Sequence, residues 1–108
     1  MDNYKITFTR TARQDIENIY NYICYNLKSN ITADRLLDKL EYTVGTLSYM
    51  PFRHKIYDRE PWKSRNLRVM PVDNYIVFYI PDNSQKNVNI ITILYGGRDI
   101  DEVLNNIK

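Results

Sequence analysis

The chain has 108 residues, of which 44% are hydrophobic and 26% charged, with three glycines and four prolines. This composition excludes collagen-like, linker-like and intrinsically disordered chains, and the length suits one domain spanning residues 1–108. The formal net charge of +2 by itself excludes little. No apolar signal segment opens the chain, and the longest apolar run, residues 75–80, is too short for a bilayer. We therefore expect a soluble cytoplasmic protein without membrane contact.

The first half of the chain predicts a strand followed by two helices. Apolar and polar residues alternate over 4–8, which is typical of a strand with one buried face. A capping box beginning at Thr11 and an apolar stripe at helical spacing predict a helix over about 12–28. Thr32 is expected to cap a second helix, which ends near Met50 because Pro51 follows. The short connection predicts an antiparallel helical hairpin.

Residues 51–70 form a basic segment. They contain six basic side chains against two acidic ones, whereas residues 1–50 are balanced and residues 71–108 have three basic and five acidic side chains. Phe52, Tyr57 and Trp62 lie between the cations. Alternating cations and rings suit a phosphate-rich or acidic partner. Alternatively, this segment is a solvated loop whose aromatic rings cover the edge of the core.

The second half predicts three strands and a final helix. Strands are expected over 67–72, 75–80 and 88–95, and the second, apolar on both faces, is expected in the middle of the sheet. Asp99, with Glu102 three residues later, predicts the cap of a last helix. The order β-α-α-β-β-β-α predicts an α+β fold in which the helical hairpin packs on a small antiparallel sheet.

Single candidate residues point to little chemistry. Cys24 lacks a catalytic partner at a suitable spacing, and we interpret it as a packing residue. His54 is flanked by cations that would lower its pKa and keep the imidazole neutral, which suits a general base. Alternatively, His54 is a solvent-exposed histidine of a loop. No cluster of His, Cys and acidic residues predicts a metal site. The tyrosines near the helical stripes are expected to pack at the core edge (Tyr20, Tyr22, Tyr25, Tyr42, Tyr49).

Two arginines are more informative. Arg68 interrupts an apolar strand and must point to the face opposite Leu67 and Val69, while Arg98 follows two glycines that let a partner approach the backbone. If their strands are neighbours, both guanidinium groups could converge on one sheet face and bind a phosphate or carboxylate. Alternatively, Arg98 pairs with a nearby aspartate and Arg68 with an acidic residue on another strand.

Four segments together resemble the toxins of the RelE/ParE superfamily, from bacterial type II toxin–antitoxin systems. They are residues 9–16, 33–40, 67–79 and 93–99, and their order and spacing match over nearly the whole chain. The resemblance implies the same helical hairpin on a small antiparallel sheet. It also implies a growth-inhibiting protein without a cofactor, neutralised by a cognate antitoxin that is encoded beside it and wraps its surface.

The superfamily contains two kinds of toxin, and the matching residues favour the ParE-like kind. RelE-like members cut mRNA on the ribosome and have an arginine where this chain has Ile76 and a tyrosine where it has Leu104. ParE-like members poison DNA gyrase and share the pair Phe78 and Tyr79 and a Gly-x-Arg-Asp ending. Tyr95 stands where they have a histidine.

Three hypotheses follow from the resemblance. The first is a gyrase-binding toxin, with residues that contact the target or the antitoxin expected at Arg53, Lys55, Arg59, Trp62, Lys63, Arg65, Arg68 and Arg98. The second is a ribosome-dependent mRNA endonuclease, in which Arg68 and Arg98 stabilise developing charge and His54 or Tyr95 moves protons. The third is a toxin without potency that acts with its antitoxin as a DNA-bound co-repressor.

Overall fold

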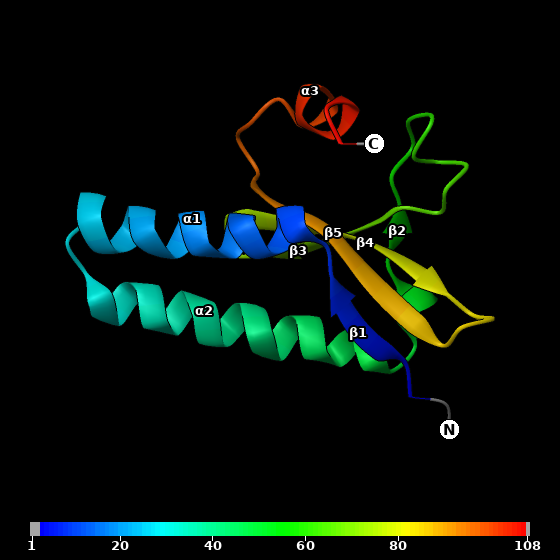
Figure 1. Ribbon diagram of the computed structural model, residues 1–108, viewed down its shortest axis with the longest axis horizontal. Helices are drawn as coiled ribbons and strands as arrows, with labels where there is room; N and C mark the ends of the chain where they lie inside the picture. Colours follow the sequence, from blue (N-terminus) through cyan, green and yellow to red (C-terminus); the bar gives the residue numbers. More distant parts are fainter. Residues whose placement is uncertain (1–2, 108) are drawn as a thin grey trace.

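The computed structural model describes residues 3–107, and Figure 1 shows their arrangement. The strands and α-helices are β1 (Lys5–Phe8), α1 (Arg10–Asn26), α2 (Asn30–Gly45), β2 (Lys55–Ile56), β3 (Arg68–Val72), β4 (Tyr75–Asp82), β5 (Asn87–Tyr95) and α3 (Ile100–Asn105). Two short 3₁₀ turns, η1 (Thr46–Ser48) and η2 (Pro51–Arg53), lie between α2 and β2. In this part of the chain, no helix is both long and apolar enough to cross a membrane.

The five strands form one sheet in the order β1-β5-β4-β3-β2. The α+β fold class is therefore confirmed, and β4 occupies the middle of the sheet as its two apolar faces predicted. Two features differ from the expected sheet: β1 pairs with β5 in parallel, and the two-residue strand β2 was not predicted. Both depend on contacts between distant parts of the chain, which local periodicity does not report.

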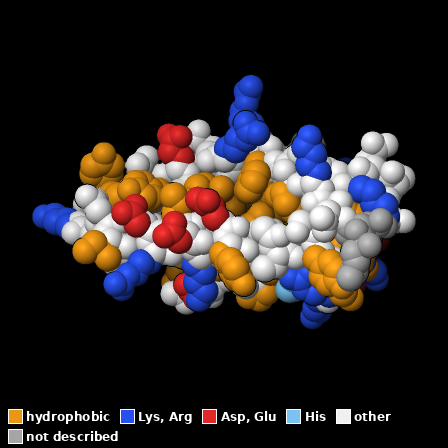
Figure 2. Space-filling view, turned by 90° about the horizontal axis from the view of Figure 1, so that it is seen from below, with side chains coloured by type: hydrophobic (Ala, Val, Ile, Leu, Met, Phe, Trp, Pro, Cys, Tyr) orange, Lys and Arg blue, Asp and Glu red, His pale blue; other side chains and the backbone are white. Residues whose placement is uncertain are grey.

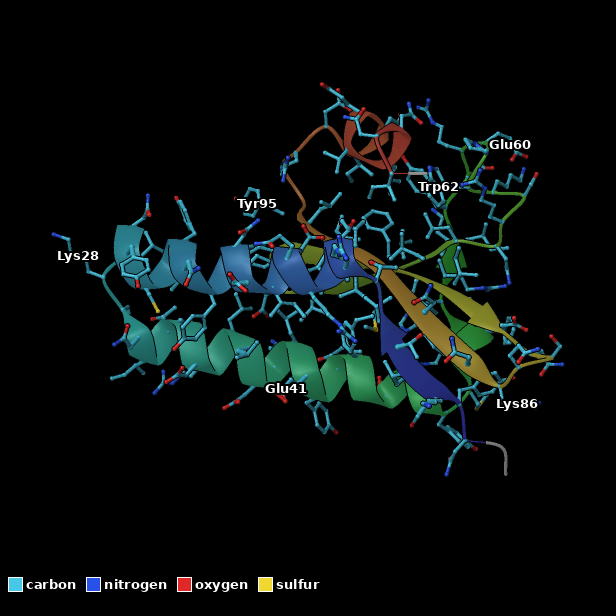
Figure 3. The ribbon with its side chains drawn as sticks, in the orientation of Figure 1. Lys28, Glu41, Glu60, Trp62, Lys86 and Tyr95 are labelled. Atoms are coloured by element: carbon cyan, nitrogen blue, oxygen red, sulfur yellow. The ribbon has the colours of Figure 1, made fainter. Side chains whose placement is uncertain are left out.

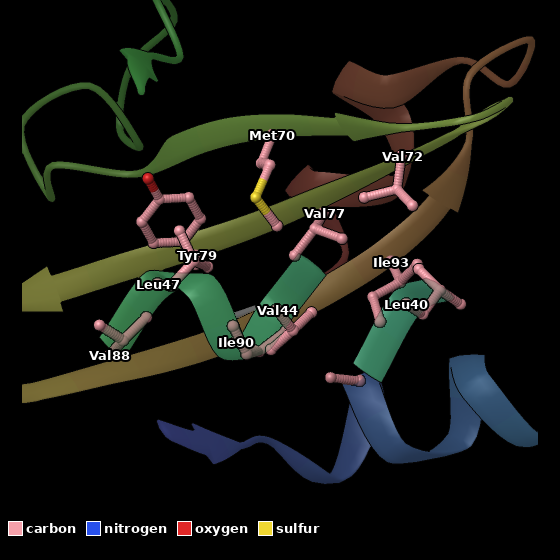
Figure 4. Close-up of a cluster of buried hydrophobic side chains, with 11 residues drawn as sticks. Leu40, Val44, Leu47, Met70, Val72, Val77, Tyr79, Val88, Ile90 and Ile93 are labelled. Carbon is pink, nitrogen blue, oxygen red and sulfur yellow. The ribbon is translucent and has the colours of Figure 1, made fainter. Parts of the chain in front are cut away.

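Helices cover both faces of the sheet. In Figure 1 the hairpin of α1 and α2 lies along one side, and α3 lies on the other, next to the loop that joins β2 to β3. The core under the hairpin is shown in Figure 4 and includes Leu40, Val44, Leu47, Met70, Val77, Tyr79 and Ile90. The core under α3 includes Trp62, Leu67, Phe78, Ile91, Leu94 and Leu104. The sheet is thus buried on both faces, which explains the continuous apolar run in β4.

The N-terminal caps of the two hairpin helices differ from the predicted ones. Thr9, not Thr11, caps α1, because its Oγ1 accepts a hydrogen bond from the Ala12 amide at 3.0 Å. The same hydroxyl donates to the Ile91 carbonyl oxygen at 2.7 Å, so a contact with the sheet selects Thr9. Ser29, not Thr32, caps α2, with its Oγ accepting from the Thr32 amide at 3.1 Å.

Substitutions at Thr9 and Thr11 test which residue caps the N-terminus of α1. Thr9→Ala is expected to lower the free energy of unfolding by about 1–2 kcal/mol, since both the cap and the bond to β5 are lost. Thr11→Ala, within the first turn of α1 and exposed, should change it by less than about 0.5 kcal/mol. Urea unfolding monitored by circular dichroism compares the two variants. Equal losses would contradict the assigned cap.

Candidate functional site

Most cations of the basic segment, residues 51–70, bind groups of the same chain. Arg53 donates from Nη1 to the carbonyl oxygens of Thr46, Tyr49 and Met50, at 3.3, 2.7 and 3.1 Å. Its Nη2 donates to Thr46 Oγ1 at 2.9 Å. Since the last carbonyls of a helix attract cations, Arg53 stabilises the turn that follows α2.

Arg68 is a second cation of the basic segment that binds groups of the same chain. Its Nη1 donates to the carbonyl oxygens of Phe52 and His54, both at 2.8 Å, and its Nη2 donates to Asn66 Oδ1 at 3.0 Å. The guanidinium also lies 5.1 Å above the centre of the Phe52 ring. The alternative in which Arg68 pairs with an acidic residue on another strand is wrong, because Nη1 and Nη2 bind these neutral groups. The buried Nε has no hydrogen-bond partner among the described residues.

Three more cations of the segment have partners within the chain: Arg59 with Asp101 at 3.3 Å, Lys63 with Asp58 at 3.0 Å, and Arg65 above the Trp62 ring at 4.8 Å. Among residues 51–70, this leaves Lys55 on the edge strand β2 as the cation without an intramolecular partner. Five of the six cations of this segment thus contact groups of the same chain, namely Arg53, Arg59, Lys63, Arg65 and Arg68.

Trp62 lies in the interior. Its side chain is 4% exposed and packs in the core under α3, and Figure 3 shows it between the β2–β3 loop and that helix. A ring in this position has no surface to offer a partner. The aromatic residues of the segment divide accordingly: Trp62 belongs to the core, whereas Phe52 remains partly exposed.

Arg98 and Tyr95 lie at the far end of the sheet from Arg68. On the sheet, Arg68 is opposite Tyr79, whereas Tyr95 is opposite Tyr75, four residues away along β4, or about 13 Å. The arginine side chains therefore do not converge as the sequence suggested. The prediction that Arg68 points away from Leu67 and Val69 is confirmed, because those two residues pack in the core under α3.

Arg98 is exposed, and its nearest acidic residues in the sequence already have other partners. Asp99 accepts from the Glu102 amide as the predicted cap of α3, and Asp101 binds Arg59 and the Tyr57 hydroxyl. The alternative in which Arg98 pairs with a nearby aspartate is therefore wrong. Within residues 3–107 the guanidinium has no bonded partner, which leaves it available for a ligand.

His54 lies against the core under the hairpin. Its ring meets Tyr79 edge-on, with centroids 6.2 Å apart, and its buried Nε2 has no hydrogen-bond partner among the described residues. Burial, and secondarily the charge of Arg53, lower the pKa of His54 below its usual value. The neutral imidazole predicted from the sequence is thus favoured, although packing, more than the neighbouring cation, is responsible.

The lowered pKa of His54 predicts acid sensitivity. The unfolded chain takes up a proton on this residue near pH 6.5, whereas the folded protein resists it to lower pH. Stability is therefore expected to fall as the pH drops through that value. His54→Gln should flatten the dependence between pH 7 and pH 5 in urea unfolding. An identical slope in the variant and the parent protein would exclude His54 as the cause.

A groove separates the outer half of the hairpin from the end of the sheet. Its volume is about 970 Å³. The helices contribute apolar and polar side chains including Ile19, Tyr22, Leu36 and Arg35, and the sheet end contributes Tyr75, Ile93, Tyr95 and Arg98. The sequence marked Arg98 and Tyr95 as candidates, but it could not show that they face Arg35 and Tyr22 across this groove.

The outer face of the hairpin exposes more apolar surface than the stripe pattern predicts. Tyr25 and Tyr42 are 76% and 77% exposed, so the expectation that they pack at the core edge is wrong for these two. Figure 2 views the molecule from the α2 side, with hydrophobic side chains and a row of acidic ones over the hairpin. Basic side chains are scattered around this face and form no single patch on it.

Cys24 is a partly buried free thiol on α1. In residues 3–107, no group of three or more His, Cys, Asp or Glu side chains could hold a metal ion.

The arrangement of hairpin, sheet and C-terminal helix is that of RelE/ParE toxins. A structure of the chromosomal ParDE toxin–antitoxin system from P. aeruginosa has a TM-score of 0.70 and 14% identity, covering 85% of this chain and 95% of that one. The RelBE2 complex from Mycobacterium tuberculosis has a TM-score of 0.65 and 25% identity, covering 88% and 93%. A mutant of E. coli RelE in the free state has a TM-score of 0.63 and 14% identity, covering 97% and 94%.

Residues 6–100 match the family described as the ParE toxin of the type II toxin–antitoxin system parDE. Because the match spans most of the sequence, the chain belongs to the ParE toxin family. This confirms the resemblance to RelE/ParE toxins. No curated protein matches the chain significantly in sequence.

Proposed function

We propose that this toxin inhibits bacterial growth by binding DNA gyrase and that a cognate antitoxin neutralises it. The choice of gyrase follows from membership in the ParE family, together with the ParE-like residues noted in the sequence. The antitoxin is suggested by relatives that are toxin–antitoxin complexes, including ParDE from P. aeruginosa and RelBE2 from Mycobacterium tuberculosis.

The separation of the candidate nuclease residues is the observation that favours binding over RNA cleavage. General acid–base catalysis and charge stabilisation require groups within hydrogen-bond reach of the same reacting atoms. Here Arg68 lies about 13 Å along β4 from the position of Tyr95, and its guanidinium is bonded to backbone carbonyls. Such an arrangement does not concentrate on one phosphate the groups that cleavage needs.

Arg98, which is exposed and has no partner within residues 3–107, is the side chain that we assign to the target. Arg98→Ala should relieve growth arrest when the toxin is produced without its antitoxin, because the side chain can contact a partner and stabilises nothing within the described residues. Arg10→Ala is the matched control, since it also removes an exposed guanidinium that has no partner there. The control variant is expected to remain toxic.

A biochemical comparison tests the target itself. The purified toxin should inhibit supercoiling by gyrase or trap cleaved DNA, while mRNA on translating ribosomes stays intact. Cuts in ribosome-bound mRNA at defined codon positions, with gyrase unaffected, would overturn the proposal and favour the mRNA endonuclease. If adding the antitoxin abolishes the inhibition of supercoiling and the trapping of cleaved DNA, the proposed neutralisation is supported.

A further inference from the structure

The two acidic side chains that line the groove between the hairpin and the sheet end, Asp15 and Asp73, each bind other groups of the chain through one carboxylate oxygen. Asp15 accepts hydrogen bonds from the Thr92 hydroxyl at 2.5 Å and from the Ile93 amide at 3.0 Å. Asp73 pairs with Lys39 at 2.5 Å, which links the β3–β4 turn to α2. The other oxygen of each carboxylate, Asp15 Oδ1 and Asp73 Oδ2, has no hydrogen-bond or ion-pair partner among residues 3–107.

Strong donors in the groove remain available. Arg35 enters it from α2 and Arg98 from the loop after β5, and neither guanidinium has an ion-pair or hydrogen-bond partner within residues 3–107. Each group presents five N–H donors in a planar fork that fits phosphate or carboxylate oxygens. The lining holds three cations, Arg35, Lys39 and Arg98, against the two carboxylates of Asp15 and Asp73, so the groove has a net positive charge.

Three tyrosines complete the lining. The rings of Tyr75 and Tyr95 meet edge-to-face with centroids 5.7 Å apart, and Tyr22 faces them from α1. Burial, then the nearness of Tyr95 and Tyr22, raises the pKa of Tyr75, so its hydroxyl stays a neutral donor. No described residue hydrogen-bonds to any of these three hydroxyls.

The Tyr95 ring lies close to the backbone of Gly97, in space that a side chain at residue 97 would need. A Cβ added at Gly97 would lie 2.9 Å from Tyr95 Cε2, closer than packing allows. The ring therefore lies against the backbone of the turn, and Tyr95 is 51% exposed. Figure 3 shows Tyr95 beside α1. An exposed ring is suited to stacking against a flat ligand.

We propose that this groove binds a nucleoside phosphate, with the phosphate oxygens on Arg35 and Arg98 and the base against the tyrosine rings. Its volume of about 970 Å³ is at the upper end of small-molecule sites. Phosphate oxygens only accept hydrogen bonds, which matches a groove rich in free donors. An acidic peptide fits less well, because its carboxylates could bind the two arginines but would leave the exposed tyrosine rings without a stacking partner.

Calorimetric titration of the purified toxin with ATP tests this site, independently of whether gyrase is the target. Saturable binding is expected, and Arg35→Ala and Arg98→Ala should each weaken it by about tenfold or more. Gly97→Ala should also weaken it by displacing the Tyr95 ring. Arg10→Ala, which removes an exposed guanidinium far from the groove lining, should leave the affinity unchanged.

Two further probes identify the source of the nucleotide and the role of the base. Inorganic phosphate alone should bind more weakly than ATP, because it lacks the stacked ring. A short 5′-phosphorylated single-stranded DNA that binds more tightly than ATP assigns the site to a strand end, and the reverse order assigns it to a free nucleotide. The proposal is overturned if neither nucleotide probe binds saturably, if both arginine variants bind like the parent, or if polyglutamate binds more tightly than either.

Discussion

Trp62→Ala is expected to lower the free energy of unfolding by about 3–5 kcal/mol, the range for removing a large buried aromatic side chain. The indole is 4% exposed and packs with Leu67, Phe78 and Leu104 between the sheet and α3. Domains of this size are stable by about 5–15 kcal/mol, so the variant would lose a large share of its stability. Urea unfolding followed by circular dichroism measures the difference.

Two further variants separate packing from binding at this position. Trp62→Phe keeps a ring and removes the indole N–H, which is buried and has no hydrogen-bond partner within the described residues. It should therefore cost less than about 1.5 kcal/mol. Phe52→Ala removes a ring of the same segment that is 39% exposed, and it should cost much less than Trp62→Ala. A Trp62→Ala protein of normal stability that no longer arrests growth would show instead that Trp62 contacts a partner.

The elements of this fold could be predicted because local patterns specify them. The apolar stripes of the hairpin, the two-sided apolar run of β4 and the Asp99 cap of α3 all depend on residues within a few positions of one another. The caps at Thr9 and Ser29 were missed because a nearby Thr offers the same local chemistry. At Thr9 the deciding contact is with Ile91, 82 residues later.

The candidate site was less predictable because charge in a sequence does not show where a cation finds its partners. Arg53 and Arg68 look like exposed binding residues until the carbonyls that they contact are known. Conversely, nothing near Arg35 in the sequence marks it, since it shares a groove with Arg98 only after the hairpin folds over the sheet. In the folded protein, most cations of the basic segment have partners, whereas Arg35 and Arg98 in the groove have none among residues 3–107.

Arg68→Ala is expected to lower the free energy of unfolding by about 1–3 kcal/mol, because hydrogen bonds from a charged group to exposed and partly buried acceptors are lost. The guanidinium holds the carbonyls of Phe52 and His54 and the side chain of Asn66. Its loss should loosen the residues between α2 and β3 while the sheet remains. Arg68→Lys should recover only part of the stability, since one ammonium cannot reproduce the planar fork.

Arg65→Ala is the matched control for this effect. It removes a neighbouring arginine of the basic segment that lies 4.8 Å above the Trp62 ring, at an exposed position worth less than about 1 kcal/mol. The growth assay then distinguishes Arg68 from Arg98 as the arginine that contacts the target. Arg68→Ala should weaken toxicity in proportion to the loss of folded protein, whereas Arg98→Ala should weaken it at unchanged stability. If Arg68→Ala abolishes toxicity and unfolds like the parent protein, its contacts with Phe52 and His54 are not its main task, and Arg68 binds the target directly.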